Sequence, residues 1–433
     1  MADAAAVRED METRRPILDA IGPAVLNVSF SSDNTCFAVA IEDGFKIYTS
    51  ADCELRDGRD TEDGVAIAEM LGTTRYLALV GGGRQPKFPT NKVIIWCQRT
   101  QRPLQTLSFS VPVIRVHVNK SHYLVALQDS INLYANPQNG AVAPAKLSYH
   151  HTTSNPYGLC CLGQKFTTFL GQRPGQVWVV ELPSQGRKGD IGIIPAHTSS
   201  LRALAMSKDE EYIATASEKG TIIRVFSTST SAKIAEFRRG IDPAIVYGLA
   251  FSPGNGRLAA TSDKGTLHIF ELQSVSKAPT TASKSSAAST ISGRSSSSSP
   301  PSNGDDWETV SSGGPPEPKW GALASVPIAP RIFRDTYSSA SCPFELGDEP
   351  DRWQAGRIGS MSTMSPRDGK WNVEVPGWPG GRPPKGIVGW LSEEELVVIG
   401  AGQSSLWQSF IVQKNSEGKL VCGRRGWKKI NDH

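Results

Sequence analysis

Long apolar runs are missing from this chain. No stretch approaches the ~18 consecutive apolar residues of a membrane-spanning helix, and residues 1–15 lack the apolar centre of a secretory signal peptide. Cysteine is scarce as well: the seven cysteines are scattered and include no Cys-x-x-Cys pair, which argues against a disulfide framework and against a structural zinc site. We therefore expect a protein of a reducing, cytoplasmic compartment whose contact with membranes is peripheral.

A charge excess of either sign is also absent. The chain has 46 Lys and Arg against 42 Asp and Glu, with a net charge of +4. Because this balance does not favour wholesale nucleic-acid binding, we expect no nucleic-acid partner and only a local basic surface. His117, His122, His150 and His151 show no metal-ligand spacing, and no Ser/His/Asp or Cys/His arrangement is recognisable. We therefore expect no metal, no cofactor, no small-molecule substrate and no enzymatic activity.

Short apolar, β-branched runs separated by turns follow one another along most of the chain. Seven units are present, and they begin near Val25, Val65, Val113, Leu159, Leu201, Ile245 and Ile387. The first six begin about 40 to 48 residues apart, which is the period of four-stranded propeller blades. No segment has a helical apolar period over several turns. The pattern predicts an all-β protein, a single seven-bladed β-propeller over residues 1–433 with a flexible N-terminus at residues 1–20.

One interval breaks this rhythm. Between Leu272 and about Lys370 no strand is expected, so we assign residues 273–369 to an insertion loop within blade 6 and place the fourth strand of that blade near residues 370–375. The part from Ser274 to Pro318 is rich in Ser, Thr, Pro and Gly, and we expect it to be disordered. The following part mixes apolar, aromatic and basic residues, as segments at a membrane interface do. The predicted membrane-insertion residues are Trp320, Leu323, Ile328, Ile332 and Phe333. The alternative is a strip that packs on the propeller or binds a protein.

The stretch Phe237-Arg238-Arg239-Gly240 ends an expected strand. Adjacent residues of a strand point to opposite faces, so the two arginines can serve two anion sites. Guanidinium groups are planar, forked donors that match phosphate oxygens. A second Arg-Arg-Gly, at Arg424 and Arg425, lacks hydroxyl and histidine neighbours. We interpret it as the solvated face of the final strand, or as a supplementary contact to anionic lipid.

Similar polar segments flank the first arginine pair. Ala196–Ser200, which contains His197, and Thr215–Phe226 lie upstream of it, and Thr261–Phe270 lies in the unit after it. Each unit offers hydroxyl groups, a cation and a histidine that can be protonated, which are groups that bind phosphate esters. The repeat predicts two similar phosphate-binding sites.

These segments, together with Gly81–Val93, resemble the PROPPIN family, the WIPI-type autophagy WD-repeat proteins, and lean toward the branch of the shorter WIPI paralogues and the yeast swollen-vacuole homologue. The resemblance implies seven-bladed propellers that bind phosphatidylinositol 3-phosphate and phosphatidylinositol 3,5-bisphosphate. It also places the sixth-blade insertion where the family has its membrane-inserting loop. The first implied site comprises His197, Ser199, Thr221, Arg224 and Arg238. The second implied site comprises Arg239, Ser262, Thr266 and His268.

The resulting hypothesis is a phosphoinositide-binding peripheral membrane effector in autophagy and related vacuolar or endosomal traffic. The expected partners are phosphoinositide-containing membranes and an autophagy lipid-transfer or scaffold protein. The expected location is the cytoplasm, with recruitment to preautophagosomal, endosomal and vacuolar membranes. The alternative is a protein-only WD-repeat scaffold in which the arginine pair binds acidic or phosphorylated peptides.

Overall fold

The computed structural model describes residues 23–136, 144–183, 189–272, 336–347, 354–355, 372–373, 376 and 383–430. Strands are the only regular elements in these ranges, and none of their residues belongs to a helix that is long and apolar enough to cross a membrane. Residues 1–20, the serine-rich part of the expected insertion and the five predicted membrane-insertion residues all lie outside the described residues.

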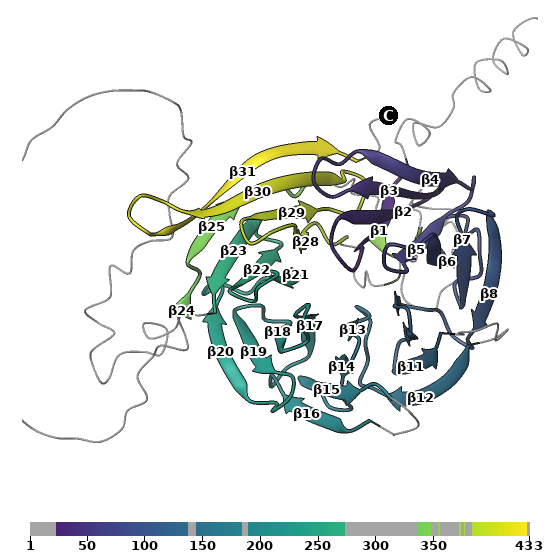
Figure 1. Cartoon of the computed structure of the whole chain (residues 1–433), viewed down its shortest axis with the longest axis horizontal. Helices are drawn as coiled ribbons and strands as arrows, with labels where there is room; N and C mark the ends of the chain where they lie inside the picture. Colours follow the sequence, from purple (N-terminus) through teal and green to yellow (C-terminus); the bar gives the residue numbers. More distant parts are fainter. Residues whose placement is uncertain are drawn as a thin grey trace, which may run out of the picture.

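The strands form a seven-bladed β-propeller, as the sequence predicts (Figure 1). Blades 1 and 2 comprise β1 Val25–Phe30, β2 Cys36–Ile41, β3 Gly44–Thr49, β4 Leu55–Asp60, β5 Val65–Met70, β6 Tyr76–Gly81, β7 Lys92–Cys97 and β8 Arg102–Ser108. Blades 3 and 4 comprise β9 Arg115–Val118, β10 His122–Ala126, β11 Ser130–Ala135, β12 Ala145–His151, β13 Cys160–Leu162, β14 Phe166–Leu170, β15 Gln176–Glu181 and β16 Ile191–Pro195.

The remaining three blades complete the ring. Blade 5 comprises β17 Leu201–Met206, β18 Tyr212–Ser217, β19 Ile222–Ser227 and β20 Lys233–Arg238, with the short β24 Thr336–Tyr337 added at its outer edge. Blades 6 and 7 comprise β21 Val246–Phe251, β22 Arg257–Ser262, β23 Thr266–Glu271, β25 Ala340–Pro343, β28 Ile387–Trp390, β29 Glu395–Ile399, β30 Leu406–Lys414 and β31 Leu420–Lys429. Each four-stranded blade is an antiparallel meander.

Position within a blade decides which residues a strand needs. The second strand of blade 1, β2, is packed between its sheet neighbours and the next blade, and five of its six residues are buried. The outer strand β4 lies at the rim, and its sequence Leu-Arg-Asp-Gly-Arg-Asp is almost entirely exposed. Because apolar burial drives packing, the runs visible in the sequence are mainly the inner three strands of each blade.

Blades 7 and 1 meet where the ring closes. The backbone groups of Val25 and Gly402 exchange hydrogen bonds of 3.0 and 2.8 Å. The indole nitrogen of Trp407 donates to the carbonyl oxygen of Ser50 at 3.0 Å. All four strands of blade 7 come from one continuous part of the chain, so closure depends on contacts between complete blades.

Blade 6 differs from the prediction in its fourth strand. The predicted strand near residues 370–375 is wrong, because β25, Ala340–Pro343, pairs with β23 instead. Asn372–Val373 forms β27, which pairs with β26, Gln354–Ala355, in a separate two-stranded sheet. Ala340 and Cys342 of β25 are buried against blade 7, a contact between distant segments that local sequence patterns do not show. The chain between the third and fourth strands of blade 6 therefore spans residues 272–339.

Two cysteines are also paired, which scattered spacing did not suggest. Cys342 on β25 and Cys422 on β31 form a disulfide between blades 6 and 7, with their Cα atoms 5.8 Å apart. The other five cysteines are free thiols. No group of three metal-ligating side chains occurs in the ranges that the structure describes.

Candidate functional site

The arginine pair lies where the outer strand of blade 5 ends. Arg238 is opposite Ile222 in the β19–β20 pairing, and the backbone N–H of Arg239 donates to the carbonyl oxygen of Thr221 at 2.9 Å. Side chains alternate along an extended strand, so these two diverge. Arg238 is half-buried, whereas Arg239 is only 8% exposed. The two guanidinium groups therefore have different surroundings.

Arg224 is held firmly on the same face of blade 5 as Arg238. Its Nε donates to Glu236 at 2.8 Å, and its Nη1 donates to the carbonyl oxygen of Ala196 at 2.6 Å. Lys233 also donates to Glu236, at 2.9 Å. Glu236 precedes Arg238 by two residues on β20 and lies opposite Arg224 in the sheet. Sequence reasoning missed Glu236, although its spacing of two from Arg238 on one strand was a usable signal.

His197 lies beside Arg224. Its Nε2 is 3.0 Å from the hydroxyl oxygen of Thr215. Burial, reinforced by the positive charge of Arg224, lowers the pKa of His197 to about 4. The imidazole is therefore neutral at pH 7 in this structure, although the sequence analysis treated it as a possible cation. Glu236 is ionised: burial acts to raise its pKa, but hydrogen bonds from Lys233 and Arg224 lower it to about 2.

Two hydroxyl residues complete the first predicted site. Ser199 is half-buried and follows His197 by two residues in the segment that joins β16 to β17. Thr221 is half-buried and immediately precedes β19. The structure thus brings His197 and Arg224 into one cluster and places the other predicted residues on the strands and turns next to it.

The second predicted site lies on the other side of the arginine pair. The guanidinium group of Arg239 donates to the carbonyl oxygens of Gly220, at 2.7 Å, and of Asp242. His268 is half-buried, and its Nδ1 is 3.2 Å from the hydroxyl oxygen of Ser338. Burial, with a contribution from the positive charge of Arg239, lowers the pKa of His268 to about 4. Arg239 and His268 are therefore close enough to interact, and His268 is also neutral at pH 7.

Ser262 and Thr266 differ in how accessible they are. Ser262 is fully buried, and its hydroxyl has no hydrogen-bond partner among the residues that the structure describes. A direct contact with a ligand would need the turn at Asp263–Gly265 to move. Thr266 is half-buried at the start of β23, so it is available at the surface of the same turn.

The two blades place different residues at equivalent positions. Thr215 is the fourth residue of β18 and pairs with Arg224, whereas Ala260 is the fourth residue of β22 and pairs with His268. The turns start alike, since Gly220 and Gly265 have φ angles of 59° and 66°. Between this glycine and the paired part of the third strand, blade 5 has one residue more than blade 6. His268 therefore occupies the place of Arg224, which alignment of the repeated Gly-Thr pairs does not show.

A short segment connects the two predicted sites. In β24, Thr336 and Tyr337 pair in parallel with Phe237 and Arg238 at the edge of blade 5. The next residue, Ser338, contacts His268, and the chain then continues into β25 of blade 6. Figure 1 shows β24 alongside β20, at the end of β25. The sequence pattern predicts no strand at these residues.

Comparison with models of protein families matches residues 24–297 to the PROPPIN family. The chain belongs to the PROPPIN family. PROPPINs are known as phosphoinositide-binding propellers. An SVP1-like protein 2 of Emericella nidulans is 43% identical to this PROPPIN over 363 residues, which cover 83% of this chain and 98% of the relative. An SVP1-like protein 2 of Neurospora crassa is 40% identical over 443 residues, covering 97% and 99% of the two chains.

A solved structure shows the same fold. Kluyveromyces lactis Hsv2 superposes on this PROPPIN with a TM-score of 0.65 over 94% of this chain and 100% of that one, at 18% sequence identity. At this level of identity, the match shows a shared propeller architecture.

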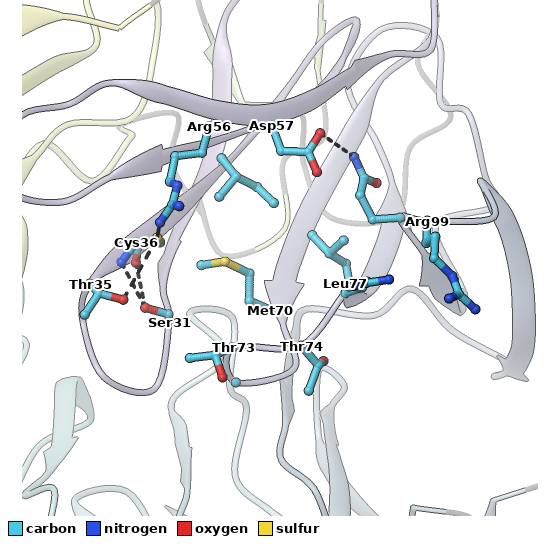
Figure 2. A pocket seen from close by; sticks show the side chains of 14 residues that line it. Ser31, Thr35, Cys36, Arg56, Asp57, Met70, Thr73, Thr74, Leu77 and Arg99 are labelled. Atoms are coloured by element: carbon cyan, nitrogen blue, oxygen red, sulfur yellow. Dashed lines mark hydrogen bonds between the residues drawn. The ribbon is translucent and has the colours of Figure 1, made fainter.

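This PROPPIN also has a groove between blades 1 and 2 (Figure 2), whereas the arginine pair lies at the end of β20 in blade 5. The groove has a volume of about 530 Å³, with Met70 and Leu77 among its apolar residues and Arg56 and Arg99 among its charged ones. The side-chain amide of Gln98 donates to the carboxylate of Asp57 at 3.0 Å, and a dashed line marks this bond at Asp57 in Figure 2. None of the site residues predicted from the sequence lies in this groove.

Proposed function

We propose that this PROPPIN recognises phosphatidylinositol 3-phosphate and phosphatidylinositol 3,5-bisphosphate through two sites on the rim of blades 5 and 6. The observation that carries the proposal is the divergence of two adjacent arginines. Arg238 lies on the face that holds Arg224 and His197, and Arg239 lies near His268. Two sites on one rim can engage two lipids of the same membrane, which makes the second contact effectively intramolecular.

The chemistry of the first site suits a phosphomonoester. Arg224 is already oriented by Glu236 and by the carbonyl oxygen of Ala196, so little side-chain entropy is lost when a phosphate binds. His197 is neutral in this structure, and a bound phosphate raises its pKa because an opposite charge favours the imidazolium. The function is recognition of a lipid head group, and no bond of the lipid is broken.

We place this recognition in autophagy and related vacuolar or endosomal membrane traffic, with the protein moving from the cytoplasm to preautophagosomal, endosomal and vacuolar membranes. An autophagy lipid-transfer or scaffold protein is the proposed protein partner. Trp320, Leu323, Ile328, Ile332 and Phe333 are proposed to enter the membrane interface after the arginines have found lipid. Family membership supports these statements.

Liposome flotation tests the proposal. Vesicles with and without phosphatidylinositol 3-phosphate are mixed with the wild-type chain and with the Arg238→Thr, Arg239→Thr double variant. The wild type should float only with the phosphorylated lipid, and the variant should lose binding by far more than tenfold, because each charge-assisted contact contributes ~1.5 to 3 kcal/mol.

The chain contains its own control for charge. Arg424 and Arg425 form the second Arg-Arg-Gly and pair with Glu345, which follows β25, and with Glu395 of β29. The Arg424→Thr, Arg425→Thr variant removes the same charge and should keep lipid binding. Equal losses in both double variants would indicate non-specific attraction. Binding of a phosphopeptide without binding of the vesicles would favour the protein-only scaffold.

A further inference from the structure

The centre of the propeller contains a cavity that shares no residue with the predicted rim sites. It has a volume of about 700 Å³ and is lined by innermost strands, among them β1, β9, β17, β21 and β28. In Figure 1, β1, β17, β21 and β28 surround the middle of the ring. The volume falls within the ~300 to 1,000 Å³ of pockets that hold small molecules.

Cationic and phenolic side chains from four consecutive blades line one side of this axial cavity. Arg115 comes from β9 in blade 3, Tyr157 precedes β13 in blade 4, Arg202 comes from β17 in blade 5, and Tyr247 comes from β21 in blade 6. The guanidinium carbon of Arg202 lies 4.0 Å from the centre of the Tyr157 ring. The pairing of β17 shifts register at Arg202, and such a bulge redirects the side chain.

Among the residues that the structure describes, neither Arg115 nor Arg202 has a carboxylate within ion-pair distance. The nearby acids are engaged elsewhere. Glu69 pairs with His117 at 2.9 Å. The carboxylate oxygens of Glu210 accept three backbone N–H groups, those of Gln164, Lys165 and Phe166. Asp263 accepts the backbone N–H of Ile245 at 3.0 Å.

The charges in this cavity repel one another. Burial lowers the pKa of Arg202, and the positive charge of Arg115 adds to that effect, partly opposed by Tyr157, Tyr247 and Asp263. An arginine stays protonated under these conditions, so two guanidinium groups share a partly enclosed space. A bound anion removes this repulsion and satisfies their donors.

We propose that the axial cavity binds a small soluble polyphosphate-type anion, with Arg115 and Arg202 donating to its phosphate oxygens. Arg115 and Arg202 lie among apolar residues of the cavity wall, such as Leu204 from blade 5 and Leu249 from blade 6, and Val28, Ile387 and Val388 line it from blades 1 and 7. A compact phosphate compound with an uncharged portion fits two arginines set among apolar side chains. The proposal is independent of lipid recognition, because the cavity and the rim sites share no residue.

Isothermal titration calorimetry with inorganic tripolyphosphate tests the proposal on the full chain at low salt. The wild type is compared with two double variants. The channel variant, Arg115→Gln with Arg202→Gln, changes the axial cavity, and the rim variant, Arg238→Thr with Arg239→Thr, changes the rim sites. The rim variant should retain one tripolyphosphate site. The channel variant should lose that site, with affinity about 100-fold weaker, because each lost charge-assisted contact costs about tenfold.

Two further measurements separate a structural effect from loss of binding. Arg115→Gln alone leaves the contact between Arg202 and Tyr157 untouched and should weaken tripolyphosphate binding about tenfold. The channel variant should still float with liposomes that contain phosphatidylinositol 3-phosphate, so failure of one proposal is distinguishable from failure of the other. Absence of binding by the rim variant with a melting curve like that of the wild type, or unchanged binding by Arg115→Gln, overturns the proposal.

Discussion

The predicted site on blade 5 and the predicted site on blade 6 come from repeated sequence, yet they differ in chemistry. On blade 5, Arg224 and Arg238 share a face with the ionised Glu236. On blade 6, His268 replaces Arg224, and Arg239 already donates to two carbonyl oxygens. A one-residue difference in a turn therefore gives the blade 5 site two arginines on one face, whereas the blade 6 site has one arginine and a histidine in the place of Arg224.

The largest expected difference is in head-group affinity. Arg224→Ala should weaken the blade 5 site by about 10- to 150-fold, because a charge-assisted hydrogen bond contributes ~1.5 to 3 kcal/mol. Calorimetry with soluble inositol 1,3-bisphosphate should then detect one site instead of two. His268→Ala is the matched change on blade 6 and should cost less. If His268→Ala costs more, the order of the two sites is reversed.

The second expected difference is in how much Arg239 and Arg238 contribute to the free energy of unfolding. Arg239→Gln withdraws donors from the carbonyl oxygens of Gly220 and Asp242 and should lower the free energy of unfolding by ~2 to 3 kcal/mol. Arg238→Gln, at the half-buried adjacent position, should lower it by less than Arg239→Gln does. Urea denaturation followed by tryptophan fluorescence measures both. Equal losses would show that the buried and half-buried arginines are structurally equivalent.

Acid should act through the two site histidines. The folded-state pKa of His197 and of His268 is about 4, below the ordinary value of 6.5. The unfolded chain therefore binds protons first as the pH falls, and the free energy of unfolding decreases between about pH 6.5 and 4, by roughly 2 to 3 kcal/mol per histidine. Between pH 7.5 and 5.0, the free energy of unfolding should fall less in the His197→Gln, His268→Gln variant than in the wild type. Urea denaturation at the two pH values measures this difference.

His117 also changes the pH dependence of stability, in the opposite direction. Burial acts to lower the pKa of His117, but the charge of Glu69 raises it to about 10. His117 therefore contributes stability that is fully present below pH 6.5 and is lost as the pH rises toward 10. It is present in both proteins, so the difference between them isolates His197 and His268. An identical pH dependence in the two proteins would contradict the neutral state of the site histidines.

The smallest expected effect concerns the chain outside the described residues. Deleting Ser274 to Pro318 should leave liposome binding nearly unchanged, because we expect this serine-rich segment to act as a flexible tether. Replacing Leu323, Ile328, Ile332 and Phe333 with Asp should weaken liposome binding without changing affinity for inositol 1,3-bisphosphate. A large drop in the thermal midpoint of the Asp variant would instead favour packing of this strip on the propeller.

Most of the fold was predictable because each inner strand carries a local apolar run. The strands at Val25–Phe30, Lys92–Cys97 and Ile387–Trp390 lie where the sequence indicates them. The fourth strand of blade 6 was not predictable in this way. The tetrapeptide at Ala340–Pro343 has little strand character, and its place depends on pairing with β23 and on packing against blade 7. The partnership of Cys342 with Cys422 depends on that same placement.

The candidate site divides in the same manner. The arginine pair and its repeated neighbours could be found from residue types and spacing, since strand alternation is a local property. Residue types and spacing do not show three other features of the site. These are the burial of Ser262, the ion pair between Arg224 and Glu236, and the contact of Ser338 with His268. Each of these depends on how strands and turns from separate blades approach one another.

By itself, the sequence determined the number of blades, their order and the position of the adjacent arginines, because these follow from short-range periodicity along one strand or one repeat. Only the tertiary structure decided that His197 and His268 are neutral, that Arg239 is buried, and that Arg115 and Arg202 face one cavity from blades 3 and 5. The physical reason is that desolvation and charge interactions depend on distances across the ring, and residues far apart in sequence set those distances.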